Sequence, residues 1–436
     1  MTRAIVARLS KLKLDHARSE RIADYLAVAT AASLPWSTSA AGILIAAWLV
    51  SFLLTYPSTA IRQELATAAG GLPALLWLFA VLGMLWADAG LAQRLSALGG
   101  FHKLLLIPLL LAQFRRSERG AWVLYGFLAS CSALMLASWI QHVLWLLAPV
   151  HETTGRVPGV PVRDYIAQSA ELSVCAFALL ALSIDRVRSR AWPIRLGSAA
   201  LALLFLANVF YVATGRTSLV VFPVLFAALG FWWSGWRGLV GASVAACAVC
   251  AALWLSSPLV QERVIRALED TREFRAAGDQ SSITSAAVRL ELWKKSIAFI
   301  ADAPVFGHGT GSIPGLYRRA AAAQSGIAAI ASDNPHNQYL GVAIQLGLVG
   351  TVLLLAMWLA HLSLFGGGSL VAWIGTVVVL QNMVSSLFNS HLFDFFHGWL
   401  YVIGVGVAGG MALREKSSAA ATSTPAADPR RADASQ

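Results

Sequence analysis

The sequence predicts an all-α integral membrane protein with about twelve transmembrane helices and one large helical loop between the ninth and the tenth. Two observations support this prediction. Only 13% of the 436 residues are charged and 57% are hydrophobic, whereas about 25% of the residues of an ordinary soluble protein are charged. Apolar runs of about 20 residues, long enough to cross a bilayer as a helix, recur along the chain. A soluble protein would need many helices that are hydrophobic on all sides, so this alternative is disfavoured.

Twelve apolar segments are expected to form the spans. The first contains Pro35 and several hydroxyl-bearing residues, and the fourth is short. In chain order, the expected ranges are 21–36, 38–56, 72–89, 101–114, 121–147, 166–184, 195–213, 217–234, 238–256, 337–362, 369–388 and 395–413.

Basic residues in the short loops predict that both chain ends face the cytoplasm, because Lys and Arg are enriched in cytoplasmic loops. The N-terminal arm is basic and amphipathic, and it continues into the first span instead of a cleavable signal peptide. The loops at 113–120 and 185–195 are also rich in arginine. The predicted organisation is a basic cytoplasmic arm, nine spans, a large periplasmic loop, three spans and a disordered cytoplasmic tail, at 1–20, 21–256, 257–335, 336–413 and 414–436.

The loop at 257–335 is longer than a connection between two spans requires. It carries nine basic and eight acidic residues, but a long loop translocates whatever its charge, so this count alone decides nothing. Helices are expected at 260–277 and 283–301. In the second, an apolar face at helical spacing is predicted to lie on the membrane or on the ends of the spans, and it comprises Leu290, Trp293, Ile297 and Ile300.

Several function classes are disfavoured by composition and spacing. The net charge of +11 is spread over loops and chain ends and forms no basic domain with interleaved aromatic residues, so nucleic-acid binding is rejected. All four cysteines lie in apolar runs, and Cys247 and Cys250 are interpreted as packing residues of a span rather than a redox pair. No spacing typical of a metal site occurs.

His336 lies where a polar loop enters an apolar run. The sequence predicts that Asn334 caps the tenth span and that Pro335 is its first helical residue, with His336 and Asn337 in the first turn. The helix dipole there favours a neutral imidazole, which can act as a general base or as a hydrogen-bond donor. From its position alone, a capping role is slightly favoured over catalysis.

Two arginines are expected on the same side as His336. Arg216 follows Gly215 in a tight turn between two spans, where either a bound anion or a lipid phosphate compensates its charge. Arg289 adjoins the apolar face of the second loop helix. Together with His336, these arginines suggest a site for a doubly charged anion such as a lipid diphosphate, because guanidinium groups pair bidentately with phosphate.

Two further motifs remain open at this point. The glycine-rich "GHGTG" at 307–311 offers backbone N–H groups for phosphate, although a plain turn is favoured. Near the start of the last span, His391, Asp394 and His397 either support the site or are simply solvated.

The chain resembles the O-antigen ligase family in its polytopic layout, its late large loop and the motifs "GRTS", "RLELW", "GHGTG" and "HNQYL". The resemblance implies a GT-C-like architecture in the inner membrane of a Gram-negative bacterium. It implies inverting transfer of a glycan from undecaprenyl diphosphate to lipid A–core on the periplasmic side, without metal, nucleotide or other cofactor. The family's two arginines and its His-Asn pair match Arg216, Arg289, His336 and Asn337.

This resemblance assigns catalysis to Arg216, Arg289 and His336. His336 would take a proton from the acceptor hydroxyl or orient it, and the arginines would stabilise the leaving diphosphate. The expected substrate-binding residues are Asn337, which orients a sugar or His336, Trp293, which closes the site against lipid, and four others, Arg156, Arg163, Arg266 and Tyr339.

Three rival functions stay open. An O-antigen polymerase and a protein O-oligosaccharyltransferase would share the donor and the arginines and differ in the acceptor. A lipid-linked glycan transporter would require ionisable residues near the middle of the bilayer, where Glu171 is the main exception in an otherwise apolar region. No carboxylate pair offers another route to glycosyl transfer.

Overall fold

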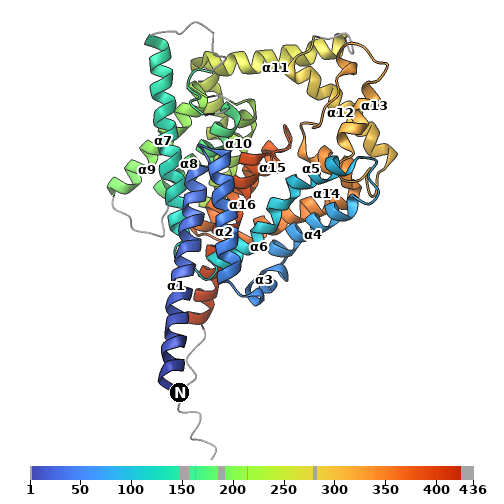
Figure 1. Cartoon of the computed structure of the whole chain (residues 1–436). Helices are drawn as coiled ribbons and strands as arrows, with labels where there is room; N and C mark the ends of the chain where they lie inside the picture. The colour runs from blue at the N-terminus through green and yellow to red at the C-terminus, as the bar shows by residue number, and fades with distance from the viewer. Residues whose placement is uncertain are drawn as a thin grey trace, which may run out of the picture.

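The computed structural model describes residues 2–147, 157–162, 164–184, 192–213, 215–277 and 282–423, and within these ranges it contains helices and no strand. Figure 1 shows α1 and α16 extending from one end of the molecule, while α11 lies across the opposite end. The helices are α1 (Thr2–Ser33), α2 (Thr38–Thr55), α3 (Ser58–Leu65), α4 (Ala68–Gly83), α5 (Leu91–His102), α6 (Leu106–Phe114), α7 (Gly120–Leu147), α8 (Tyr165–Ile184), α9 (Trp192–Tyr211), α10 (Arg216–Ser256), α11 (Pro258–Ala277), α12 (Ser285–Asp302), α13 (Ile313–Ala321), α14 (Gln338–Leu364), α15 (Leu370–Ser385) and α16 (Phe395–Ser423).

The all-α membrane fold is confirmed, although fewer than twelve of the described helices are individually long and apolar enough to cross a membrane. Among the described residues, eight helices are long and apolar enough to cross a membrane, or nine if the bent pair α3–α4 counts as one span. Every predicted range contains a helix. The difference arises because two predicted spans fall within α10, because α15 has only 16 residues, and because the polar N-terminal half of α1 makes that helix less apolar than the others.

α10 is a helical hairpin rather than one straight helix. Its backbone leaves the helical region at Ser234 and at Gly235, where φ is +57°. Beyond this turn the two halves pack against each other through Gly230 and Gly238, and a Cβ on either glycine would overlap the carbonyl oxygen of the other. The predicted boundary between spans at 234–238 therefore coincides with the turn, and the halves are called the first half (216–233) and the second half (236–256).

Polar side chains tie the helices together near the chain termini. Asp24 of α1 accepts hydrogen bonds from Gln113 Nε2 at 2.9 Å and from Ser117 Oγ at 2.8 Å. Arg115 lies 3.0 Å from the buried carboxylate of Glu64. The arginine-rich loop at 113–120 is thus bound to α1 and α3, which fixes the ends of α6 and α7.

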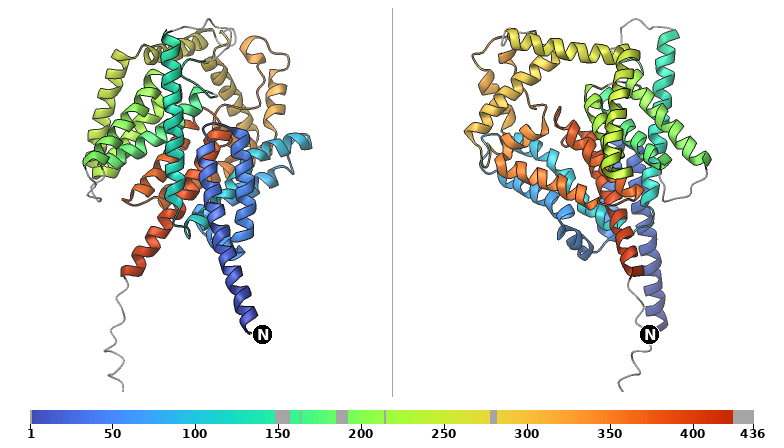
Figure 2. Two further views of the ribbon diagram at one scale, coloured as in Figure 1. Left: turned by 60° about the vertical axis from the view of Figure 1, so that its left-hand side comes forward. Right: turned by 180° about the vertical axis from the view of Figure 1, so that it is seen from behind.

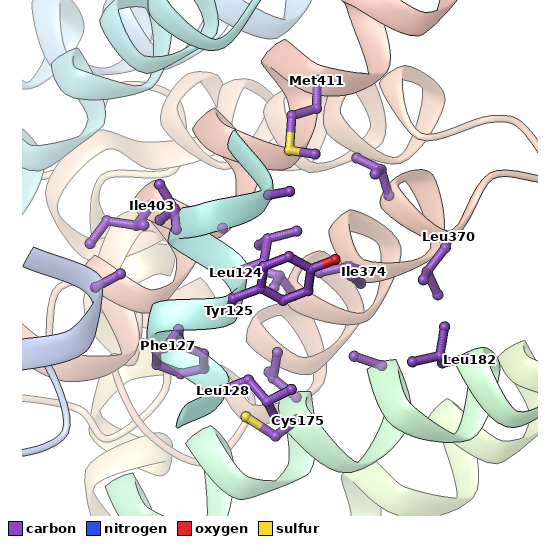
Figure 3. A pocket seen from close by; sticks show the side chains of 18 of the residues that line it. Leu124, Tyr125, Phe127, Leu128, Cys175, Leu182, Leu370, Ile374, Ile403 and Met411 are labelled. Carbon is purple, nitrogen blue, oxygen red and sulfur yellow. The ribbon is translucent and has the colours of Figure 1, made fainter. Parts of the chain in front are cut away.

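A large apolar cavity of about 480 Å³ lies between α7, α8, α15 and α16 (Figure 3). Leu124, Leu128 and Ile374 line it, and Glu118 and Arg414 stand at its border. Arg414 belongs to the same end of the molecule as the loop at 113–120, since its Nη1 donates to the carbonyl oxygen of Ser117 at 3.0 Å. This cavity therefore opens near the terminal end, away from α11.

The glycine-rich turn 307–311 inserts into a break in α14. Gly347 has φ +62° and interrupts the helix, which leaves the preceding carbonyl groups without helical partners. The turn supplies them, because His308 N–H donates to Ile344 O at 2.8 Å and Gly309 N–H donates to Gln345 O at 2.9 Å. The backbone N–H of Thr310 donates to Gly83 O, and that of Gly311 donates to Gln345 Oε1.

All four N–H groups from His308 to Gly311 are therefore used within the protein. This arrangement matches the plain-turn interpretation and leaves no cradle for phosphate. The turn instead joins the long loop to α4 and α14, which places the segment before α14 at a fixed position.

Replacement of Gly309 by alanine is expected to destabilise the protein by about 1–3 kcal/mol. Gly309 has φ +88°, and a Cβ would lie 2.5 Å from Ala87 Cα, so both the backbone and the contact resist a side chain. The unfolding midpoint of the purified protein in detergent should fall by several degrees. Gly315→Ala is the control, because the nearest atom to its Cβ would be 3.6 Å away; equal midpoints for the two variants would contradict the role of the turn.

α12 packs against α13 and α14 through one side. Leu292 and Phe299 are buried and pack with Tyr317 of α13 and Ile344 of α14. Of the predicted apolar face, Ile300 packs partly against this cluster, whereas Ile297 is 63% exposed. An exposed Ile297 is compatible with the prediction that this face lies on the membrane.

Candidate functional site

Three residues from distant parts of the sequence meet at the end of the bundle where α11 crosses. Arg216 is the first residue of α10, Arg289 lies near the start of α12, and His336 immediately precedes the cap of α14. Burial lowers the pKa of Arg289, and the positive charge of Arg216 lowers it further. Arg289 in turn is one of the charges that lower the pKa of His336. The predicted catalytic residues therefore share one electrostatic environment.

The predicted N-cap of the tenth span is wrong by three residues. Asn337, not Asn334, is the N-cap of α14, and its Oδ1 accepts from Tyr339 N at 2.9 Å and Leu340 N at 3.2 Å. Pro335 therefore lies outside the helix. His336 adopts φ +52°, a left-handed conformation that histidine tolerates better than most residues. Because Asn337 is the cap, His336 is not, and its ring contacts Asn389 instead.

A hydrogen-bond chain fixes the tautomer of His336. Asn334 Oδ1 accepts from the backbone N–H of His336 at 2.8 Å and from Ser390 Oγ at 2.7 Å. Its Nδ2 must then donate, and it does so to Asn389 Oδ1 at 3.3 Å. The same oxygen lies 3.0 Å from His336 Nδ1. Because an oxygen acceptor faces Nδ1, this nitrogen carries the proton, and Nε2 of the neutral ring holds the lone pair.

The surroundings of His336 keep its ring neutral at pH 7. Burial lowers its pKa, the hydrogen bond to Asn389 raises it, and the positive charge of Arg289 lowers it, with a net result below the usual value. A neutral imidazole with a directed Nε2 lone pair is the form that accepts a proton from a hydroxyl group.

Asn389→Asp is expected to shift the acidic limb of the pH profile of kcat/KM upward. A carboxylate at this position stabilises the imidazolium form and raises the pKa of His336, so the neutral ring disappears at a higher pH as the solution is acidified. Asn389→Ala removes a hydrogen bond that raises the pKa and should shift the limb downward or leave it in place. Profiles that coincide for both variants and the wild type would rule out titration of His336 as the origin of the limb.

Arg216 already has an acidic neighbour. Its Nη1 lies 3.8 Å from Asp270 Oδ2 of α11, a loose ion pair that leaves the guanidinium able to bind a stronger anion. Arg263 of α11 stacks over the ring of Tyr165 at 4.9 Å, and Tyr165 also acts on the pKa of Arg289. α11 thus brings a third arginine beside the two predicted ones.

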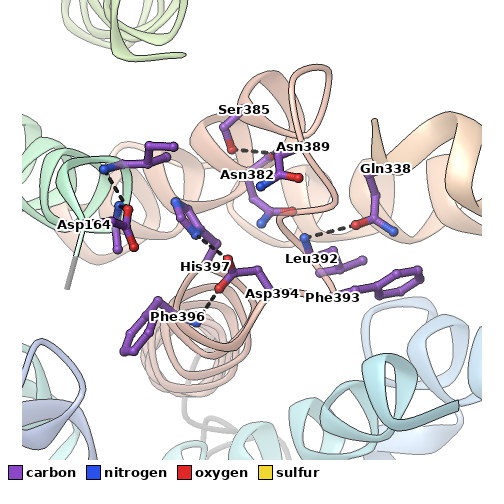
Figure 4. Close-up of polar contacts among 12 residues, drawn as sticks. Asp164, Gln338, Asn382, Ser385, Asn389, Leu392, Phe393, Asp394, Phe396 and His397 are labelled. Atoms are coloured by element: carbon purple, nitrogen blue, oxygen red, sulfur yellow. Dashed lines mark hydrogen bonds and ion pairs between the residues drawn. The ribbon is translucent and has the colours of Figure 1, made fainter. Parts of the chain in front are cut away.

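His391 and His397 form a buried pair beside this site, so the alternative that they are simply solvated is excluded. Their rings stack with centroids 3.9 Å apart and an interplanar angle of 7°, and His391 is only 1% exposed. In Figure 4, His397 points at Asp394, with Nδ1 3.6 Å from Oδ2. Burial opposes ionisation of Asp394, but its contacts with His397 and with Phe396 N–H lower its pKa to about 2.

The histidine pair lies close to the arginines. Burial, His397 and Arg289 all lower the pKa of His391, which Asp394 raises. A small cavity is lined by His391 and His397 together with Thr217 and Ser218, the residues that follow Arg216. The pair therefore lies beside the start of α10.

Two of the predicted substrate-binding residues hold the site together through the backbone. Asn337 donates from Nδ2 to Leu387 O at 3.1 Å, in addition to capping α14. Trp293 donates from Nε1 to Pro335 O at 3.1 Å, which links α12 directly to the residue before His336.

Tyr339 and Arg266, two other predicted binding residues, make different contacts. The hydroxyl of Tyr339 donates to Met383 O at 3.0 Å, inside the bundle. Arg266 is 64% exposed on α11 and pairs with Glu262 at 2.5 Å. Arg156 and Arg163 lie outside the described residues.

The arrangement as a whole is suited to one kind of chemistry. Three guanidinium groups around α11 attract an anion with several oxygen atoms. A neutral histidine nearby accepts a proton. These two functions on one site fit a reaction in which an oxyanion leaves and a hydroxyl group attacks.

Residues 199–355 match the family model described as O-antigen ligase. The matched region includes Arg216, Arg289, His336 and Asn337, the residues on which the resemblance of the sequence rests. A comparison with curated proteins found no match. The match covers about a third of the chain; it supports assignment to the O-antigen ligase family and, with the apolar helices, indicates a membrane-embedded, glycosyltransferase-like enzyme.

Proposed function

We propose that this protein is an O-antigen ligase, which transfers O-antigen glycan from undecaprenyl diphosphate to lipid A–core oligosaccharide. The observation that supports this best is the directed Nε2 lone pair of His336 in the electrostatic environment of Arg216 and Arg289. The reaction takes place at the periplasmic face of the inner membrane of a Gram-negative bacterium. In keeping with this, Figure 2 shows α1 and α16 leaving the molecule at one end, opposite to α11, the helix whose Asp270 pairs with Arg216.

The arginines act on the leaving group. As the bond between the anomeric carbon and the diphosphate oxygen breaks, negative charge builds up on the diphosphate. Arg216 and Arg289 stabilise this charge where it develops, which is the interaction that lowers the barrier. Asp270 is displaced from Arg216 when the diphosphate binds, because a diphosphate offers more charge and more acceptors than a carboxylate 3.8 Å away.

His336 acts on the acceptor. The acceptor hydroxyl oxygen attacks the anomeric carbon from the face opposite the diphosphate, and its proton passes to Nε2. One displacement of this kind inverts the configuration at the anomeric carbon and needs neither metal nor nucleotide. Asn389 holds the ring through Nδ1, and Asn337 and Trp293 hold the backbone on either side of it.

The remaining predicted residues have supporting roles in this proposal. Trp293 also separates the site from lipid. Arg266, Arg156 and Arg163 add positive potential for the approach of the anionic donor. Tyr339 fixes the start of α14 on α15.

Transfer in vitro tests the proposed reaction. Purified protein is mixed with undecaprenyl-diphosphate-linked glycan and lipid A–core, with and without a chelator. The expected product is glycan on lipid A–core in both samples. A lengthened donor glycan would identify a polymerase, a glycosylated protein would identify an oligosaccharyltransferase, and movement of intact donor across vesicles without a new bond would identify a transporter.

A further inference from the structure

An apolar slot of about 210 Å³ separates the two halves of the α10 hairpin. The first half contributes Leu219, Phe222 and Phe226 to its wall, and the second half contributes Ala246, Cys250 and Trp254. The residues are three, four and seven positions apart in the first set and four and eight in the second, so each half turns one continuous face toward the slot.

The glycine contact explains why the slot exists. Gly230 and Gly238 bring the two halves into backbone contact near the turn. Larger side chains at 219–226 and 246–254 then keep the halves apart toward α11. The second half is otherwise largely exposed, so the slot is narrow, closed at the turn and open along the outer side of the bundle.

The end of the slot that lies away from the turn is next to the cationic site. Val260 and Val264 of α11 cover this end, and Arg263 lies between them on the same helix. Leu219 stands three residues after Arg216, which is about 4.5 Å along a helix axis. The first half of α10 therefore passes from the apolar Leu219 to the cationic Arg216 within one helical turn.

We infer that this slot binds the first isoprene units of the donor lipid, with its diphosphate at Arg216. The inference rests on the proposed function and adds where the donor chain lies. A continuous apolar surface that ends at arginines matches an amphiphile with one chain and one strongly anionic head. Lipid A carries several acyl chains side by side, which a slot between two helices does not admit, and the larger cavity in Figure 3 is not lined by Arg216, Arg263 or Arg289.

Two native cysteines provide the test and its control. Cys250 lines the slot, whereas Cys247, one turn earlier, does not, and both are exposed. Undecaprenyl diphosphate should slow the labelling of Cys250 by N-ethylmaleimide in the full-length protein in detergent and leave Cys247 unchanged. Inorganic diphosphate should protect neither. Protection of Cys250 by lipid A alone or by phosphatidylethanolamine would overturn the inference, as would labelling that no lipid changes.

A second experiment uses transfer. Cys250→Trp fills the slot and should raise KM for the undecaprenyl donor by at least about tenfold, as expected for lost apolar contacts in a pocket, with little change in kcat. Cys247→Trp should leave KM unchanged. Equal KM values for the Cys250→Trp and Cys247→Trp variants would contradict binding of the donor chain in the slot, even if transfer to lipid A–core proceeds. If Cys250 is protected but no glycan reaches lipid A–core, the slot stands and the proposed function fails.

Discussion

His336→Ala is expected to lower kcat/KM for glycan transfer by about 10²–10⁴-fold, which is the usual contribution of a positioned general base. The ring accepts the proton of the attacking hydroxyl at Nε2, and alanine offers no acceptor there. The measurement is initial-rate transfer to lipid A–core by purified protein. In cells that lack the native protein, the same substitution should abolish capped lipopolysaccharide while the protein still inserts into the membrane.

His336→Gln separates proton transfer from orientation. Glutamine accepts a hydrogen bond from the acceptor hydroxyl but cannot take its proton at neutral pH. If His336 is the base, the glutamine variant should be almost as inactive as the alanine variant. Activity near the wild-type level in His336→Gln would show that the ring only orients the acceptor, and full activity in His336→Ala would remove it from the reaction.

Arg289→Ala is expected to reduce kcat by about 10²–10³-fold, comparable to the loss of one donor that stabilises charge in a transition state. Arg289→Lys should recover only part of this loss, because an ammonium group cannot pair bidentately with the diphosphate. Single-turnover kinetics with saturating donor separates this effect from weaker binding.

Arg266→Ala is the matched control for charge. Arg266 belongs to the same end of the molecule but is 64% exposed and paired with Glu262, so its removal should change kcat by no more than a few fold. A loss in Arg266→Ala as large as that in Arg289→Ala would mean that net positive charge, not a positioned guanidinium group, drives transfer.

The sequence predicted the helices and the central residues because both leave local signals. Apolar runs of sufficient length mark the helices, and the turn of α10 at 234–235 falls where two runs meet. Arg216, Arg289 and His336 stand out because ionisable groups are rare beside apolar runs. These three residues are far apart in the sequence, so local patterns do not predict that they come together. That prediction came from their charge and from the family resemblance.

Other features of the site depend on tertiary contacts that no local pattern encodes. Asn389 is one of several polar residues in a loop, and only its contact with His336 Nδ1 reveals that it sets the tautomer. Tyr165 and Arg263 meet across α8 and α11. The N-cap of α14 was misassigned because Asn334 and Asn337 are both good caps, and Asn334 is instead engaged by His336 N–H and Ser390.

The break in α14 at Gly347 has a consequence for how the protein is made. A helix inserted into lipid with open carbonyl groups is unstable, because each unsatisfied group costs several kcal/mol in hydrocarbon. The partners for Ile344 and Gln345 come from 308–309, on the N-terminal side of α14 in a long polar loop. Insertion of α14 and docking of this loop must therefore be completed together, so the folding of the segment that contains 307–311 sets the moment at which this part of the bundle becomes stable.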